Sequence, residues 1–172
     1  MKTITIALAL VLSSVLTAQT KSEQTIFFGE RQPNAPVAIP TEVLSVVLDS
    51  DPGRDGMKKA DEAQQQDPAQ MFRAAKIRLS ASDENSLVVI GNCPMCSERM
   101  TWFWLVHIVG GRPEVILFAE GSSLRVLAHK TRDYYDIDVE VPTGALPTEK
   151  IYRSDGRKYW LATTKSIEQV SH

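Results

Sequence analysis

The two cysteines form the only motif in this sequence with obvious redox or metal chemistry. Cys93 and Cys96 are separated by Pro94 and Met95. When a C-x-x-C pair stands at the start of a helix, the helix dipole and the second sulfur lower the thiol pKa and produce a reactive thiolate. The pair therefore raises three possibilities: a small structural disulfide, a redox-active dithiol, or half of a metal site.

A redox role would make the chain a thiol–disulfide oxidoreductase, with Cys93 as the nucleophile and Cys96 as the resolving thiol. The C-P-M-C spacing resembles that of the thioredoxin superfamily, a resemblance that implies Pro142 as the facing cis-proline. That arrangement needs a long helix beginning at the first cysteine. Residues 97–109 would have to supply this helix, yet their aromatic and β-branched composition favours a strand. We therefore expect a structural disulfide between Cys93 and Cys96 and keep the oxidoreductase as the alternative.

A zinc site would have to add His107 and His129 to the two cysteines. Zinc-finger histidines stand roughly three to five residues apart, whereas 21 residues separate these two. The acidic stretch 49–56 resembles a calcium loop, but Gly53 and Ala60 occupy two of its ligand positions. We expect a solvated turn there, and neither a metal nor another cofactor in the protein.

The elements that must position these residues are mostly short strands. Apolar or alternating runs predict strands within residues 72–79, 86–90, 102–109, 115–119, 124–128, 135–141, 151–153 and 157–161. Gly110-Gly111 and Asp155-Gly156 are tight-turn signals between such runs. In 135–141 the apolar residues alternate with Asp136, Asp138 and Glu140. This pattern predicts a half-buried strand with an acidic face toward water.

The fold class that follows is mainly β (α+β), an antiparallel meander of seven or eight strands with short N-terminal helices. Residues 41–48 are expected to form a helix capped by Thr41, and residues 57–66 an exposed helix. The single globular domain spans 41–165, with helices in 41–70 and the meander in 72–162. Residues 166–172 are expected to form a tail.

The N-terminus has the order of a secretory signal peptide over residues 1–18. Lys2 precedes an apolar run over residues 4–12, and the small residues Thr17 and Ala18 follow. The run is too short to cross a bilayer, which needs about 20 apolar residues. We therefore expect a mature chain that begins near Gln19, has no transmembrane segment and is exported to the periplasm or the medium. The proline-rich residues 19–40 predict an extended arm or linker.

The C-terminal two-thirds resembles small exported bacterial β-domain proteins of uncharacterised function. The resemblance covers residues 69–161 and follows the order of several short motifs. These are a W-F-W-V-like strand at 102–106, an apolar strand at 115–118, G-x-S-L-x-V-L at 121–127, Y-x-D-I at 134–137 and a closing Y-x-x-D-G-x-x-Y hairpin at 152–159. The resemblance implies an exported, mainly β domain without catalytic residues to transfer. The C-P-M-C segment is not part of the pattern.

The composition and the motifs of the sequence exclude some classes of partner and of enzyme. The formal net charge of −2 argues against a nucleic-acid partner, which would need a basic face. The chain contains no nucleophile elbow, phosphate loop or H-E-x-x-H motif. Trp102, Trp104 and Trp160 are candidates for a ligand groove, with core packing as the alternative, because Trp102 and Trp104 share one strand face. We therefore expect a non-enzymatic domain that binds a protein or small ligand.

Overall fold

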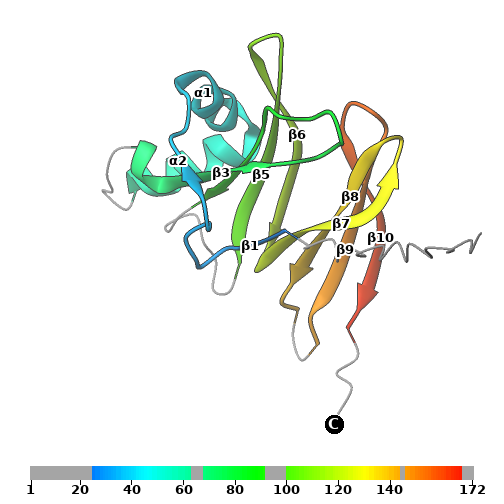
Figure 1. Cartoon of the computed structure of the whole chain (residues 1–172). Helices are drawn as coiled ribbons and strands as arrows, with labels where there is room; N and C mark the ends of the chain where they lie inside the picture. Colours follow the sequence, from blue (N-terminus) through cyan, green and yellow to red (C-terminus); the bar gives the residue numbers. More distant parts are fainter. Residues whose placement is uncertain (1–24, 63–67, 92–99, 144–145, 168–172) are drawn as a thin grey trace, which may run out of the picture.

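A computed structural model describes residues 25–62, 68–91, 100–143 and 146–167 (Figure 1). Two helices, α1 (Thr41–Asp49) and α2 (Asp51–Glu62), precede a 3₁₀ turn at Pro68–Met71. The ten strands of the described residues are β1 (Ile26–Phe28), β2 (Pro36–Val37), β3 (Phe72–Ile77), β4 (Ser86–Gly91), β5 (Thr101–Val109), β6 (Arg112–Gly121), β7 (Ser123–Thr131), β8 (Tyr134–Val141), β9 (Thr148–Ser154) and β10 (Tyr159–Ser166).

The strands form two antiparallel sheets of five strands each. Sheet A has the order β1-β7-β8-β9-β10, and sheet B has the order β2-β3-β4-β5-β6. Within each sheet the last four strands follow one another along the chain, so each sheet is a meander. The prediction of a mainly β, antiparallel fold is confirmed. The described strands outnumber the predicted seven or eight, partly because the N-terminal arm contributes β1 and β2.

The main core lies between the two sheets. Strand β5 supplies Phe103 and Leu105 to it, and β8 supplies Ile137 and Val139 from the opposite sheet. All four side chains are fully buried. The alternating apolar residues of β8 thus identify the face of this strand that packs against sheet B.

A second core lies between sheet B and the helices, as the three layers of Figure 1 show. Val43 and Val47 of α1 pack there with Trp102 and Trp104 of β5. Because one face of β5 meets sheet A and the other meets the helices, both sets of its alternating side chains are buried. This double burial explains the continuous apolar run that predicted β5.

The turn expected over residues 49–56 is wrong, because α2 begins at Asp51. Ser50 acts as the cap of this helix: its Oγ accepts a hydrogen bond from Gly53 N–H at 3.2 Å, and its carbonyl accepts one from Arg54 N–H at 2.9 Å. The helix predicted at residues 41–48 is confirmed as α1. However, its cap position is Pro40, and Thr41 provides no side-chain cap.

The described part of the expected N-terminal arm, residues 25–40, belongs to both sheets. Strand β1 pairs with β7 in sheet A, and β2 pairs with β3 in sheet B. The Arg73 guanidinium on β3 donates to the carbonyl oxygen of Gly29, which follows β1. The segment therefore links the two sheets instead of extending away from them. The predicted signal peptide, residues 1–18, lies outside the described residues.

The predicted hairpin turns are confirmed. Gly110 and Gly111 join β5 to β6 with positive φ values of 57° and 78°, a conformation that favours glycine. Between β9 and β10, Asp155 Oδ1 accepts hydrogen bonds from the N–H groups of Arg157 and Lys158, both at 2.8 Å. None of the helices in the described residues is long and apolar enough to cross a membrane.

Candidate functional site

The outer face of sheet A is the sheet face that no described helix covers, whereas α1 packs on the outer face of sheet B (Figure 1). Strand register arranges the side chains of this face in rows that cross the strands. One row contains Ile26, Arg125, Asp138, Ile151 and Thr163. A neighbouring row contains Phe28, Ser123, Glu140, Glu149 and Lys165. These rows thus place charged groups at the centre of the face, apolar groups at its β1 edge and polar groups at its β10 edge.

Asp136 is held by three side chains from two neighbouring strands. Its Oδ2 accepts a hydrogen bond from His129 Nδ1 at 2.7 Å, and its Oδ1 accepts one from Thr131 Oγ1 at 2.8 Å. Arg153 Nε on β9 lies 3.4 Å from Oδ2. His129 reaches the carboxylate because β7 bulges between Val126 and Lys130.

Asp138 is less completely partnered, although only 2% of its side chain is exposed. Its Oδ2 lies 3.1 Å from Arg125 Nη2, while its Oδ1 has no hydrogen-bond partner among the described residues. Arg125 Nε is likewise buried without a described partner. Burial raises the pKa of Asp138 from its ordinary value of 3.8 to about 6; Glu149 and Glu140 add to the shift and Arg125 opposes it.

The expectation that the acidic residues of β8 face water is wrong for Asp136 and Asp138. Both point to the outer face as their alternation predicted, but both are buried. Side chains from the flanking strands β7 and β9, Arg125 and Arg153, cover them through the ion pairs described above. Only Glu140 keeps part of its surface exposed.

The three tryptophan candidates separate into two groups. Trp102 and Trp104 are buried between sheet B and the helices, where they pack edge-to-face at a centroid distance of 5.9 Å. Trp160 is 50% exposed and pairs across the strands with Arg153, which contacts Asp136. Only Trp160 is therefore available for binding, and it lies on the outer face of sheet A.

A serine, a histidine and an aspartate also meet at the start of β4, a grouping that sequence spacing does not reveal. Ser86 Oγ lies 2.8 Å from His107 Nδ1, and Asp83 Oδ1 lies 3.6 Å from the same nitrogen. A catalytic triad needs the serine and the carboxylate on different ring nitrogens. Ser86 is also fully buried. The group is therefore a structural polar cluster.

The cysteine pair, Cys93 and Cys96, lies outside the described residues. Downstream of it, residues Thr101–Val109 form strand β5, where a thioredoxin-like arrangement needs a helix. Pro142 follows the end of β8 and lines a cavity of about 310 Å³ with Phe28 and Thr101. In the described part of the chain no three His, Cys, Asp or Glu side chains are grouped to hold a metal ion.

The geometry thus brings a partly exposed tryptophan, two arginines and two buried aspartates together on one uncovered sheet face. Of these residues, the sequence singled out Trp160 and the acidic row, and it missed Arg125 and Arg153. Comparisons with protein-family models, with curated proteins and with solved structures find no match to this chain.

Proposed function

We propose that this chain is an exported, non-enzymatic binding domain that uses the outer face of sheet A to bind a protein partner. The observation that carries the proposal is Asp138, a buried carboxylate with an unpartnered oxygen on a sheet face that no described helix covers. Buried ionisable groups with perturbed pKa values concentrate at functional sites. Asp138 and Arg125 thus leave one unpaired acceptor and one unpaired donor buried beneath the charged centre of this face.

The surroundings of the two aspartates have the composition of a protein interface. Tryptophan and arginine are enriched among the residues that dominate binding energy. Trp160 and Arg153 are cross-strand neighbours at one side of the face. Ile26 and Phe28, about 40% exposed, lie at the other side. Charged groups between apolar side chains are typical of an interface that also selects its partner by charge.

An open sheet face suits a protein partner better than a small ligand. Small-molecule sites are concave and bury most of the ligand surface. On this face, by contrast, Trp160 and Arg153 are about half exposed, and Ile151 stands on β9 between Glu149 and Arg153. Export is proposed from residues 1–18 alone, and the mass of the purified native protein tests it: cleavage near Gln19 is expected.

The binding test uses the chain from Gln19 onward as bait for chemical cross-linking in its native envelope or culture medium. Three baits are compared: the wild type, Trp160→Arg and the control Val109→Arg. Val109 is a second exposed apolar residue, 64% exposed, next to the β5–β6 turn. We expect a cross-linked protein that the wild type and the Val109 variant share and the Trp160 variant loses. Equal capture by all three baits would contradict the proposed face.

A further inference from the structure

The free edge of β1 points to a second binding site, in the slot between β1 and β3. Strand β1 is an edge of sheet A. The corresponding edge of sheet B is β2, which has only two residues and pairs with Ala74 and Ala75 of β3. From Lys76 onward, β3 therefore has no described strand beside it on this side. Two incompletely covered sheet edges thus face each other across the slot.

The backbone of β1 has hydrogen-bonding groups that β7 does not use. Val126 N–H donates to Thr25 O at 3.0 Å, and Gly29 N–H donates to Ser122 O at 2.9 Å. In an antiparallel pair the residues that bond to the partner strand alternate with residues that bond away from it. Ile26 and Phe28 therefore direct their N–H groups away from β7 and toward the free edge.

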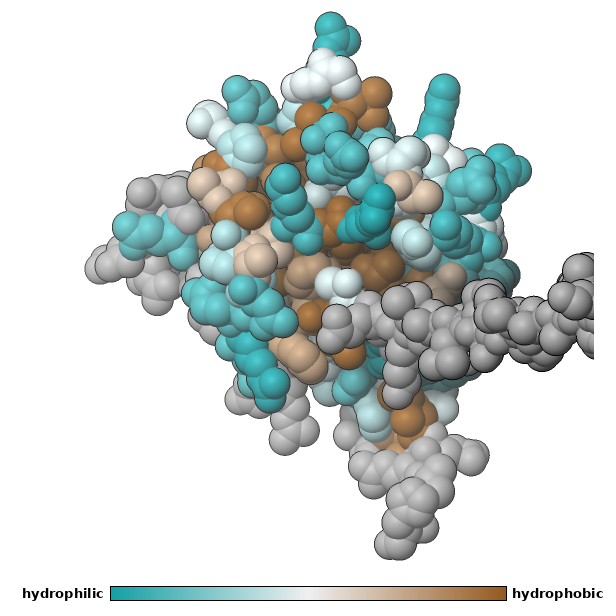
Figure 2. All heavy atoms as spheres, in the orientation of Figure 1, coloured by the Kyte–Doolittle hydropathy of each residue, from teal (hydrophilic) through white to brown (hydrophobic). Residues whose placement is uncertain are grey.

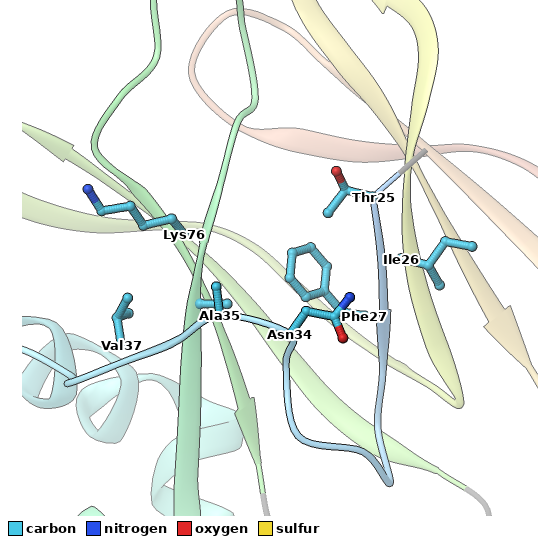
Figure 3. A pocket seen from close by; sticks show the side chains of 8 residues that line it. Thr25, Ile26, Phe27, Asn34, Ala35, Val37 and Lys76 are labelled. Atoms are coloured by element: carbon cyan, nitrogen blue, oxygen red, sulfur yellow. The ribbon is translucent and has the colours of Figure 1, made fainter. Parts of the chain in front are cut away.

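A cavity of about 430 Å³ lies beside this edge. Thr25, Ile26 and Phe27 line one side of it, and Ala75 and Lys76 line the other; Asn34, Ala35 and Val37 also line it. Figure 3 shows the Phe27 ring directed from β1 toward β3, while Ile26 points to the other side of its own strand. Because Phe27 and Ala75 belong to the core between the sheets, a side chain that enters the slot meets an apolar floor.

This edge has one of the usual protections against strand addition, its short length of three residues, but it lacks two others. Natural edge strands are also protected by charged residues or by proline. The residues Thr25, Ile26, Phe27 and Phe28 contain neither a charge nor a proline. Figure 2, in the orientation of Figure 1, shows apolar residues among hydrophilic ones near the middle of this side of the molecule. On the opposite side of the sandwich, Lys158 Nζ of the β9–β10 turn lies 3.8 Å from Glu114 Oε1 of β6.

We propose that the slot accepts an extended peptide segment of another protein as an additional strand of sheet A. The backbone of the peptide pairs with both backbone groups of Ile26 and with the N–H of Phe28, as in other cases of β-strand addition; the carbonyl of Phe28 already accepts a hydrogen bond from Arg31 N–H at 3.4 Å. Its side chains then alternate: one set enters the cavity above Phe27, and the other set extends the outer face beside the exposed Ile26 and Phe28. The peptide recognised in this way is therefore apolar at the alternate positions whose side chains enter the cavity.

A peptide fits this edge better than a second copy of the chain. The slot lies between β1 and β3 of one molecule, so the added strand must enter between two elements of the fold. A single extended peptide can do so, whereas the β1 strand of a second copy is flanked by that copy's own β2 and β3. The edge shares Ile26 and Phe28 with the outer face, but the test of that face uses Trp160 at its other side, so failure of the slot to bind can be told from failure of the proposed function.

The probe for this site is a phage-displayed library of random nine-residue peptides, panned against the chain from Gln19 onward. Selected peptides are synthesised with a fluorophore, and their Kd values are measured by anisotropy. We expect alternating apolar sequences to be enriched. We also expect the Phe28 amide to become protected from hydrogen exchange when such a peptide is added, because that N–H gains a partner.

Two variants test the geometry. Ile26→Pro removes a donor that does not bond to β7, so it blocks the edge while keeping the β1–β7 ladder. Ala35→Trp fills the cavity from an exposed position. Each should weaken peptide binding at least tenfold with an unchanged urea midpoint, and the distant Val109→Thr should bind as the wild type does. Equal binding to Ile26→Pro, or a dimer that this substitution dissociates, would overturn the proposal.

Discussion

Arg125 and Asp138 form half of a bidentate ion pair. Arg125 Nη2 lies 3.1 Å from Asp138 Oδ2, whereas Arg125 Nε and Asp138 Oδ1, the two atoms that could form a parallel second bond, have no described partner. The same Nη2 lies 3.8 Å from Glu149 Oε1. The guanidinium is therefore shared between two carboxylates, and Asp138 is incompletely neutralised in a buried position.

The stability of the protein should depend on pH through Asp138. Its folded-state pKa of about 6 is above the ordinary 3.8, so the folded state holds the proton more tightly than the unfolded state does. The stabilisation from this group is fully present below pH 3.8 and is lost as the pH rises through about 6. Relative to Asp138→Asn, the wild type should gain roughly 1 kcal/mol of unfolding free energy between pH 7.5 and pH 5.

Urea denaturation of both proteins at the two pH values measures this difference. Glu114→Gln is the matched control, because Glu114 is an exposed acid with a single weak ion pair to Lys158. Its unfolding free energy should follow that of the wild type at both pH values. If the Asp138→Asn protein also showed the same pH dependence as the wild type, Asp138 would not titrate in this range.

Ser50 should stabilise the junction between the helices and sheet B. Its Oγ accepts hydrogen bonds from Gly53 N–H and from Trp104 Nε1, the latter at 3.1 Å. Ser50→Ala removes the helix cap and leaves a buried indole N–H without its acceptor, at a cost of roughly 1–3 kcal/mol. Ser45→Ala, on the exposed side of α1, should change the unfolding free energy by less than about 0.5 kcal/mol. Similar losses in both variants, measured by tryptophan fluorescence in urea, would contradict this role.

Gly53 should be intolerant of alanine, although alanine normally favours a helix over glycine by about 1 kcal/mol. A Cβ at this position would lie 1.9 Å from the Val47 carbonyl oxygen and 2.9 Å from Leu48 Cα. Both are backbone atoms that cannot rotate away. We expect Gly53→Ala to lower the unfolding free energy by roughly 1–3 kcal/mol, because α2 must move away from α1. Asp55→Ala, at an exposed position of the same helix, is the control, and a Gly53 variant as stable as that control would refute the close approach.

The cysteine pair should not catalyse thiol exchange. Strand β5 begins at Thr101, so only residues 97–100 separate it from Cys96, and a thioredoxin-like helix needs several turns. We expect the mature protein to show no insulin reduction above the dithiothreitol background. A measured activity that disappears in Cys93→Ser would instead support the oxidoreductase alternative.

Local sequence patterns predicted the strand, the turns and the helix whose structure is determined by neighbouring residues. The alternation around Ile137 and Val139 predicted β8, and the Gly110-Gly111 and Asp155-Gly156 pairs predicted the hairpins. In each case the signal lies within a few neighbouring residues. The same holds for α1, whose apolar face is formed by residues one turn apart.

Other features depend on contacts that no local pattern contains. Gly53 and Pro52 argue for a loop, but a glycine is required where α2 crosses close to α1. The alternation of apolar and acidic residues in 135–141 predicted that Asp136 and Asp138 are exposed. In the structure, arginine side chains from β7 and β9 bury both carboxylates. Strands β1 and β2 are too short to predict, since their stability comes from their partners.

The pairing of Ile26 with Arg125 has a consequence for the order in which the sheets assemble. Strands β3 to β6 and β7 to β10 each pair with the next strand along the chain, so both meanders can form by closing short loops. Strand β1 must instead wait for a partner about 100 residues away, and the entropy cost of closing a loop rises with its length. During synthesis β1 emerges before all the other described strands, yet sheet A is completed only when β1 joins β7.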